Sequence, residues 1–247
     1  MMPVVDRCPI GIEGLDNLIS GGFPRNRTIL IAGSCGTGKS IFGVEFLNNG
    51  AVKFNEPGVL VSLEQNPELL KTDMIDLGYD LNKIEKDGKL RIIDGSLSKR
   101  GAEAIIKLRE SSPTIKPISL PEKFTIEDIG KKTIEVAKQI NAKRVVIDSI
   151  SSIDEIMCGS NVRATILNLH YTFQDAGLTT LMIFDAIESE SVAAKEGVEE
   201  YVADGVLLLK MNEALDTRTI RIKKLRATKH TLKPHVFELT SKGIKLK

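Results

Sequence analysis

The stretch "AGSCGTGKS" at residues 32–40 decides the fold of this chain. From residue 33 onward it matches the pattern G-x-x-x-x-G-K-[S/T] at every required position. Glycines let several backbone N–H groups converge on a phosphate, because side chains would block the approach and restrict the backbone angles. The motif therefore predicts a phosphate-binding loop, formed by Gly33, Ser34, Cys35, Gly36, Thr37, Gly38, Lys39 and Ser40.

The last two residues of the motif carry its chemistry. We expect Lys39 to reach the β- and γ-phosphates of a nucleotide, and the Ser40 hydroxyl to ligate Mg²⁺. A helix that begins at the loop would add free N–H groups and a favourable dipole. The motif thus predicts a site for a nucleotide with its Mg²⁺ ion.

The flanking residues favour this interpretation over a chance glycine-rich turn. The β-branched run "TILIAG" at residues 28–33 predicts a strand, and residues 39–52 place apolar side chains at roughly helical spacing. Strand, glycine loop and helix follow one another in the order that the motif requires.

Strand-like runs recur along the chain, at residues 58–64, 89–95, 143–149, 179–185 and 204–210. Helical patterns lie between many of them, with expected caps at Asn66, before Pro67, and at Thr125, before Asp128. Apolar strands that alternate with helices are typical of an α/β fold with a mostly parallel sheet covered on both faces. The short strands and turns near the C-terminus predict an antiparallel extension at one sheet edge.

We expect one domain over residues 1–247, because no linker or repeat interrupts this pattern. Within it, residues 96–124 have weak periodicity and contain three prolines. This composition predicts a helix fragment and a loop that projects from the domain.

Composition narrows the function classes. The chain has 34 Lys and Arg against 33 Asp and Glu, so its net charge of +1 gives no general attraction to nucleic acid or acidic lipid. Aromatic residues are 4% and Trp is absent, which disfavours a base-stacking platform. Three widely spaced cysteines indicate neither a disulfide framework nor a zinc site, and fit a reducing compartment. No apolar run approaches about twenty residues, so we expect a cytoplasmic protein without a membrane partner.

Two acidic residues complete the expected nucleotide site. Asp148 ends the apolar run "RVVID", where a carboxylate can hold the metal with its water shell, and Glu64 ends "LVSLE" as the candidate base for water. Ligands of an open α/β sheet bind beyond the carboxyl ends of its strands, so both acids should face Lys39. The alternatives are a helix N-cap for Asp148 and a surface acid for Glu64.

The C-terminal part contains a basic block. Residues 218–233 include seven Lys or Arg and no acid. Lys224 and Arg226 would share one face of a strand, and His230 follows four residues later. Three interpretations stay open: a solvated edge strand protected by charge, a nucleic-acid patch, or a clamp on the γ-phosphate of a neighbouring subunit.

The sequence resembles the KaiC-like branch of the RecA-type ATPases, as a single-domain member. Four blocks carry the resemblance, at residues 11–40, 58–70, 140–153 and 197–244. The resemblance implies a RecA-like core, ring hexamers and ATP at the subunit interfaces. In that family a Lys-x-Arg…His block reaches the ATP of the neighbour, which favours the clamp interpretation for Lys224, Arg226 and His230. Two departures stand out: Gln65 replaces a second glutamate beside Glu64, and Cys35 replaces the usual proline or small residue.

The resemblance also raises the question of DNA. RecA-type filaments bind DNA through two loops, which here correspond to residues 151–161 and 185–197. The first loop has two acids and no basic residue, and the second has four acids against one lysine. Such loops would repel phosphates, so DNA binding is not favoured.

Together these features predict a ring-forming protein that binds Mg·ATP, hydrolyses it slowly and serves an unidentified protein partner. Two alternatives belong to other classes. One is an ATP-gated assembly scaffold without turnover, which would not need Glu64 as a base. The other is a recombination or repair accessory protein that binds DNA.

Overall fold

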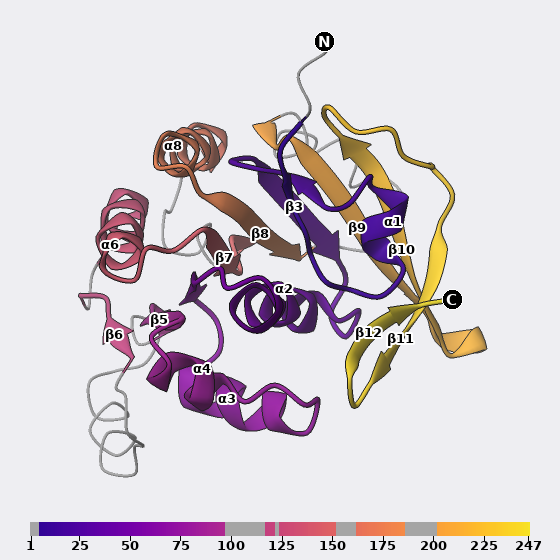
Figure 1. Cartoon of the computed structure of the whole chain (residues 1–247), viewed down its shortest axis with the longest axis horizontal. Coiled ribbons are helices and arrows are strands. Elements are labelled where there is room, and N and C mark those ends of the chain that lie inside the picture. Colours follow the sequence, from indigo (N-terminus) through magenta and orange to yellow (C-terminus); the bar gives the residue numbers. More distant parts are fainter. Residues whose placement is uncertain (1–4, 97–116, 122–123, 152–161, 186–201) are drawn as a thin grey trace.

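The computed structural model describes residues 5–96, 117–121, 124–151, 162–185 and 202–247. Within these ranges a ten-stranded sheet runs through the molecule (Figure 1). In spatial order its strands are β12 (Gly243–Leu246), β11 (His235–Thr240), β10 (Thr217–Leu225), β9 (Gly205–Asn212), β3 (Thr28–Gly33), β8 (Thr179–Asp185), β7 (Arg144–Asp148), β4 (Gly58–Ser62), β5 (Leu90–Asp94) and β6 (Ile118–Ser119).

The strand directions confirm the predicted fold class. Each neighbouring pair from β9 to β6 is parallel, whereas β10, β11 and β12 are each antiparallel to the strand before them. The molecule is therefore an α/β protein with a mostly parallel sheet and a C-terminal antiparallel extension at one edge.

Helices cover both faces of the sheet (Figure 1). On one face lie α2 (Lys39–Lys53), α3 (Pro67–Ile75) and α4 (Leu81–Lys86), and on the other lie α6 (Ile126–Gln139) and α8 (Val162–Asp175). A hydrophobic core lies on each face of the sheet, and alternate residues of β3 contribute to the two cores. Ile29 and Ile31 pack on the α2 side, and Leu30 packs on the α6 and α8 side. A parallel sheet needs this double cover, because both faces of its strands are apolar.

Two helices begin at the caps that the sequence predicts. The Asn66 side chain accepts hydrogen bonds from Glu68 N at 2.9 Å and from Leu69 N at 3.4 Å, with Pro67 in the first turn of α3. Thr125 and Asp128 form a reciprocal capping box at the start of α6. The short helix α4, which begins after Asp80, was not predicted.

The N-terminal residues form a small layer near β9 and β10 (Figure 1). It consists of the pair β1 (Arg7–Cys8) and β2 (Phe23–Pro24) and the short helix α1 (Leu15–Leu18). The Asp16 carboxylate accepts the N–H groups of Ile10 and Gly11, each at 2.8 Å. A Cβ at Gly22 would lie 2.3 Å from Cys8 O, so this tight crossing requires glycine.

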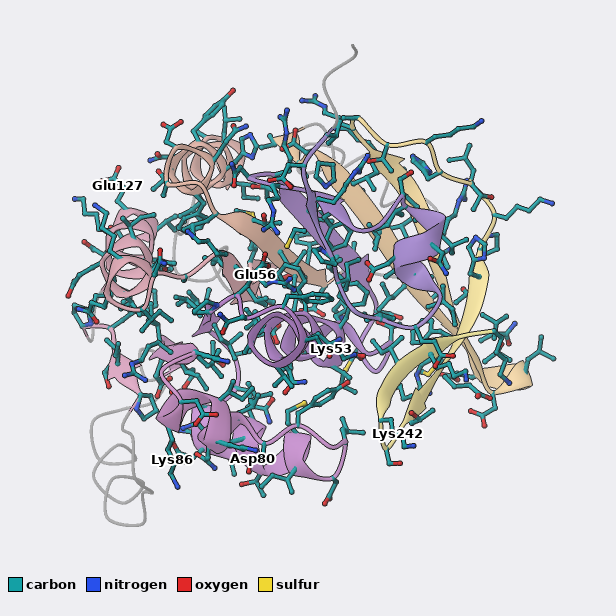
Figure 2. The ribbon with its side chains drawn as sticks, viewed as in Figure 1. Lys53, Glu56, Asp80, Lys86, Glu127 and Lys242 are labelled. Atoms are coloured by element: carbon teal, nitrogen blue, oxygen red, sulfur yellow. The ribbon has the colours of Figure 1, made fainter. Side chains whose placement is uncertain are left out.

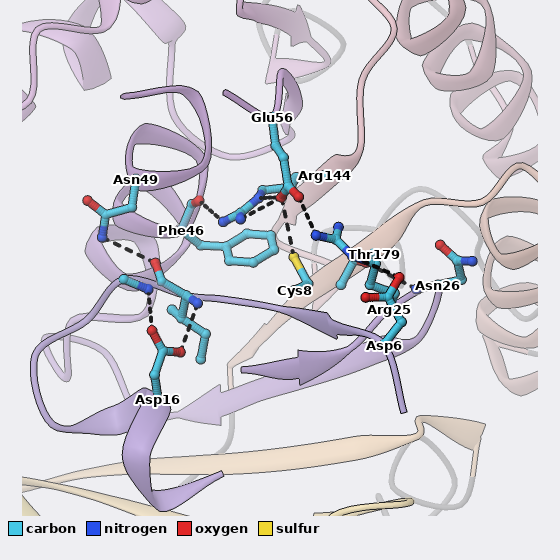
Figure 3. Close-up of polar contacts among 12 residues, drawn as sticks. Asp6, Cys8, Asp16, Arg25, Asn26, Phe46, Asn49, Glu56, Arg144 and Thr179 are labelled. Atoms are coloured by element: carbon cyan, nitrogen blue, oxygen red, sulfur yellow. Dashed lines mark hydrogen bonds and ion pairs between the residues drawn. The ribbon is translucent and has the colours of Figure 1, made fainter. Parts of the chain in front are cut away.

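Most charged side chains project into solvent, as Asp80, Lys86, Glu127 and Lys242 do at the periphery of Figure 2. An exception is a buried network at the amino-terminal edge of the sheet (Figure 3). There the fully buried Arg144 donates to Glu56 Oε2 from Nε at 2.8 Å and from Nη2 at 2.6 Å, and to Phe46 O at 2.9 Å.

The segment that we expected to project, residues 96–124, is described only in part. Residues 97–116 and 122–123 lie outside the described residues, so the projection stays an expectation there. Residues 118–119 add the edge strand β6 to β5, and Leu120 and Phe124 are buried. In the described ranges, no helix has the length and apolar character needed to cross a membrane.

Candidate functional site

The predicted phosphate loop connects β3 to α2. Gly36 and Gly38 have φ angles of 78° and 99°, a region that strongly favours glycine. A Cβ at Gly33 would lie 2.4 Å from Leu209 O on the adjacent strand β9. The glycine positions of the motif are thus required by the backbone geometry, and the predicted order of strand, loop and helix is confirmed.

Lys39, the first residue of α2, lies against the loop with only 7% of its side chain exposed. Its Nζ donates to Ser34 O at 2.8 Å and forms an ion pair with Asp185 Oδ1 at 2.8 Å. Thr37 Oγ1 donates to the same carbonyl oxygen, also at 2.8 Å. These contacts hold the ammonium group within the curve of the loop.

Asp148 ends β7 beside the first turn of α2, and its carboxylate accepts a hydrogen bond from the Ser40 side chain. Burial raises the pKa of Asp148 from 3.8 to about 6, and the nearby carboxylates of Glu64 and Asp185 add to this rise. The Ser40 hydrogen bond and the Lys39 charge act in the opposite direction. The predicted proximity of Asp148 to Lys39 and Ser40 is therefore present.

Glu64 follows β4 at the same edge of the sheet. Its Oε1 accepts a hydrogen bond from the fully buried Ser149 Oγ, which also lies 3.3 Å from Asp185 Oδ2. The side chain of Gln65 instead donates from Nε2 to Asp73 Oδ2 on α3 at 2.7 Å. The geometry thus groups Glu64, and not Gln65, with the other acids of the site.

The donor set fits a magnesium ion that shares its coordination with a nucleotide. Mg²⁺ prefers oxygen ligands and usually keeps several waters beside one or two carboxylates and phosphate oxygens. The Ser40 hydroxyl and the Asp148 carboxylate supply two such oxygens side by side. In the part of the chain that the structure describes, no group of three or more His, Cys, Asp and Glu could hold a metal ion by itself.

Sequence reasoning missed the roles of Asp185 and Ser149. We counted Asp185 only as one of the acids of a loop, yet it ends β8 opposite Gly33 and pairs with Lys39. The signal was present, because Asp185 ends a predicted strand just as Asp148 does. Sequence reasoning also missed Arg218 of β10, whose Nε donates to Gly36 O at 3.4 Å.

Lys224 and Arg226 lie away from the loop of their own chain. Lys224 pairs with Val206 on β9, and Val206 pairs with Leu30, three residues before Gly33 on β3. Because β10 runs antiparallel to β9, the residues after Lys224 continue toward the amino-terminal edge. At about 3.3 Å per residue the separation along the strands is already roughly 10 Å at Lys224, and it grows beyond this residue.

The three residues have different local contacts. Lys224 Nζ donates to Ala203 O at 2.7 Å, Arg226 Nη1 lies 3.6 Å from Asp204 Oδ1, and His230 Nδ1 lies 3.2 Å from Thr231 O. β10 has a register shift before Lys224 and ends at Leu225, so Arg226 lies one residue beyond the strand. Arg226 N still donates to Asp204 O at 2.9 Å, so the pairing with the chain of β9 continues to this residue. The side chains of Lys224 and Arg226 contact Ala203 and Asp204, which are neighbours in the chain.

The loops considered for DNA binding are largely outside the described residues. Of residues 151–161 only Ser151 is described, and of residues 185–197 only Asp185. Their expected repulsion of DNA therefore stays a prediction. Cys158 also lies outside the described residues, while Cys8 is buried and Cys35 is exposed in the loop, both as free thiols.

Comparison with known proteins identifies relatives along nearly the whole chain. A family model described as "ATPase: KaiC" matches residues 8–247. The circadian clock oscillator protein KaiC of Synechococcus elongatus is 33% identical over 238 residues, which are 95% of this chain and 43% of that protein. The chain thus spans less than half the length of this relative.

Two further matches have about the length of this chain. A UPF0273 protein of Aeropyrum pernix is 34% identical over 243 residues, covering 98% of this chain and 93% of that protein. The crystal structure of a KaiC-like protein from Pyrococcus horikoshii matches with a TM-score of 0.81 and 34% identity. It covers 99% of this chain and 100% of that one, so the two molecules share their fold.

Proposed function

Since this chain belongs to the KaiC ATPase family, we propose that it binds Mg·ATP at residues 33–40 and hydrolyses it slowly. The observation that carries the proposal is the meeting of the loop with Lys39, Asp148 and Glu64 at the carboxyl edge of the sheet. An α/β sheet binds its ligands at this edge.

The loop would bind the phosphates through its backbone N–H groups and through Lys39. The contact with Ser34 O keeps the lysine ammonium beside the loop, where we infer that the β- and γ-phosphates bind. Ser40 and Asp148 would hold Mg²⁺, which neutralises negative charge on the phosphates. The exposed thiol of Cys35 is compatible with this arrangement, because phosphate contacts in such loops come mainly from the backbone.

Glu64 would act as the base. Its carboxylate orients a water molecule and accepts a proton from it while the water oxygen bonds to the γ-phosphorus. The bond between the γ-phosphorus and the bridging oxygen breaks, and the products are ADP and phosphate. The hydrogen bond from Ser149 restricts the orientation of the Glu64 carboxylate, which is an advantage for a positioned base.

Assembly into a ring completes the proposal. Lys224 and Arg226 lie toward the edge of the sheet opposite the loop of their own chain, and His230 follows them in the segment before β11. We therefore expect the three residues to serve the loop of a neighbour. A head-to-tail contact that repeats around a closed ring supplies such a neighbour. We propose a hexamer, the ring that the resemblance to KaiC-like ATPases implies, acting in the cytoplasm with a protein partner of unknown identity.

Mixing two inactive variants tests this proposal. Lys39→Ala removes the loop contact and Arg226→Ala removes the clamp, so each variant alone should lack turnover. In an equal mixture, about a quarter of the head-to-tail interfaces would combine an intact loop with an intact clamp. We expect phosphate release to recover in proportion.

Several outcomes would contradict parts of the proposal. Mixed rings that are as inactive as either parent, with subunit exchange demonstrated, would refute the clamp. ATP binding without phosphate release in the wild-type protein would favour the assembly scaffold. Tight, salt-sensitive DNA binding that is lost in Arg226→Ala would favour the repair accessory protein. Sedimentation with and without Mg·ATP would test the ring, since a ligand held by two subunits stabilises their association.

A further inference from the structure

Asp204 is a buried carboxylate at the amino-terminal edge of the sheet, far from the phosphate loop of its own chain. It immediately precedes β9, and only 1% of it is exposed. Its Oδ1 lies 3.1 Å from Arg27 Nη1 and 3.6 Å from Arg226 Nη1. Burial of an acid is costly unless it is paired, and here two guanidinium groups share one carboxylate.

The backbone fixes Asp204 firmly. Asp204 N donates to Thr28 O at 2.9 Å, and Thr28 N donates to Asp204 Oδ2 at 3.3 Å, so both its main chain and its carboxylate are tied to β3. Arg226 N in turn donates to Asp204 O at 2.9 Å. Arg226 is therefore held to Asp204 through its backbone as well as through its guanidinium.

The turn after Arg226 is held from the other side by Arg7 of β1. Arg7 Nη1 donates to Thr228 Oγ1 at 2.5 Å, and Nη2 donates to Ala227 O at 2.9 Å. Ala227 has a φ of 55°, which a residue with a side chain adopts only where surrounding contacts hold it. The backbone at Arg226 is thus fixed on both sides, while 56% of its side chain is exposed.

A buried histidine also belongs to this group. His170 lies beside Asp204, with Nδ1 at 3.9 Å from Oδ2 and at 2.9 Å from Thr28 Oγ1. Burial lowers the pKa of His170, and the charges of Arg27 and Arg226 lower it further against the opposing effect of Asp204. Because one carboxylate faces two guanidinium groups, Asp204 anchors both arginines and the group keeps a net positive charge.

We propose that Asp204 is a positioning residue for ATP hydrolysis in the neighbouring subunit, because it holds the Arg226 guanidinium toward that subunit's γ-phosphate. This inference rests on the proposed function. A guanidinium has five N–H donors in a fixed plane, so contact with Asp204 at one end leaves the other donors for phosphate oxygens. A donor that is already oriented needs no reorganisation as charge develops in the transition state.

The test uses Asp204→Asn in the full chain, with ATP as the probe. Asparagine keeps the size of the side chain and an oxygen for Thr28 N, but removes the charge that orients Arg226. We expect kcat to fall by about 10- to 100-fold, as when a catalytic group is displaced by about 1 Å. The loss should be smaller than that of Arg226→Ala, and ATP binding to the variant's own loop should be unchanged.

Mixing experiments separate positioning from a general structural role. Asp204→Asn should recover turnover when mixed with Lys39→Ala, whose clamp is intact, but not when mixed with Arg226→Ala. A structural defect would not follow this pattern. Arg27→Gln is the matched control, since Arg27 shares the same carboxylate at 3.1 Å but has no place in the clamp. Its turnover should stay close to that of the wild type.

A second variant covers the case in which Asp204→Asn does not fold. The double variant Asp204→Asn/Arg27→Gln also removes the cation that would lose its partner, and it should show the same pattern of recovery. Wild-type turnover in either folded variant, or recovery with neither partner, would overturn the role of Asp204 alone. Failure of the Lys39→Ala and Arg226→Ala mixture would instead overturn the clamp, and the role of Asp204 with it.

Discussion

The two edges of the central sheet differ in the balance of acidic and basic side chains. At the carboxyl edge, Lys39 pairs with Asp185, and the carboxylates of Glu64 and Asp148 lie nearby. At the amino-terminal edge, Glu56 pairs with Arg25 and Arg144, and Asp6 pairs with Arg25 (Figure 3). The group at the carboxyl edge therefore has an excess of acids, whereas acids and bases are equal in number among the residues named at the amino-terminal edge.

The pKa values of the two groups reflect this difference. Burial and neighbouring carboxylates raise the pKa of Asp148 to about 6. At Glu56 burial acts in the same direction, but the hydrogen bonds and charges of Arg25 and Arg144 outweigh it and lower the pKa. The comparison indicates that balanced buried charges hold the fold, whereas an acidic excess around a phosphate loop suits a cation that arrives with its ligand.

The largest expected effect belongs to the carboxyl edge. Lys39→Ala should abolish measurable ATP binding, because the proposed site gives this lysine direct contact with the β- and γ-phosphates. The protein should stay folded, since Lys39 contacts the loop and Asp185 and does not belong to the apolar core. Calorimetric titration with Mg·ATP, beside a thermal melt, measures both properties. Wild-type affinity in the variant would refute the phosphate-loop assignment.

The next effect concerns turnover at the same edge. Glu64→Gln should reduce kcat by about 10²- to 10⁴-fold, because glutamine cannot accept the proton of the attacking water. ATP binding should be retained. Gln65→Ala is the matched control, since Gln65 contacts Asp73 on α3 and should have little influence on turnover. A strong loss in Gln65→Ala with normal turnover in Glu64→Gln would show that the base is assigned to the wrong side chain.

The smallest effect belongs to the amino-terminal edge and concerns stability alone. Glu56→Gln should lower the free energy of unfolding by about 3 kcal/mol at neutral pH, because it leaves the fully buried Arg144 without its counter-charge. Turnover of the folded variant should be unchanged. Asp6→Asn is the control: Asp6 pairs with Arg25 at 3.3 Å on the surface, where such a pair contributes less than about 1 kcal/mol. Denaturant unfolding measures both variants.

The difference in the free energy of unfolding between the wild type and Glu56→Gln should depend on pH. The pKa of Glu56 is lowered in the folded protein, so its stabilising contribution is fully present above the unfolded value of 4.5. It is lost as the pH falls through the still lower folded value. The gap between wild type and Glu56→Gln should therefore be constant from neutral pH to about 5 and close under more acidic conditions. A gap that persists unchanged in acid would mean that packing, and not charge, explains the stability of this edge.

The sequence alone determined the features that depend on residues close together in the chain. The phosphate loop, the strand before it and the helix after it follow from a local pattern of glycines and apolar residues. The caps at Asn66 and Thr125 follow from a side chain and a backbone N–H group only a few residues apart. Glu64 and Asp148 were predictable because an acid directly after an apolar strand must emerge at the edge of the sheet.

Only the tertiary structure decided which acidic and basic side chains come into contact, and at which edge of the sheet. Asp185 reaches Lys39 because β8 lies beside β3, and Arg226 reaches Asp204 because β10 returns along β9 to the opposite edge. The order and direction of strands depend on how the helices cover the whole sheet, a cooperative result of long-range packing that no local spacing records. For the same reason the sequence showed that Arg226 is basic, while its distance from the loop of its own chain emerged only from the fold.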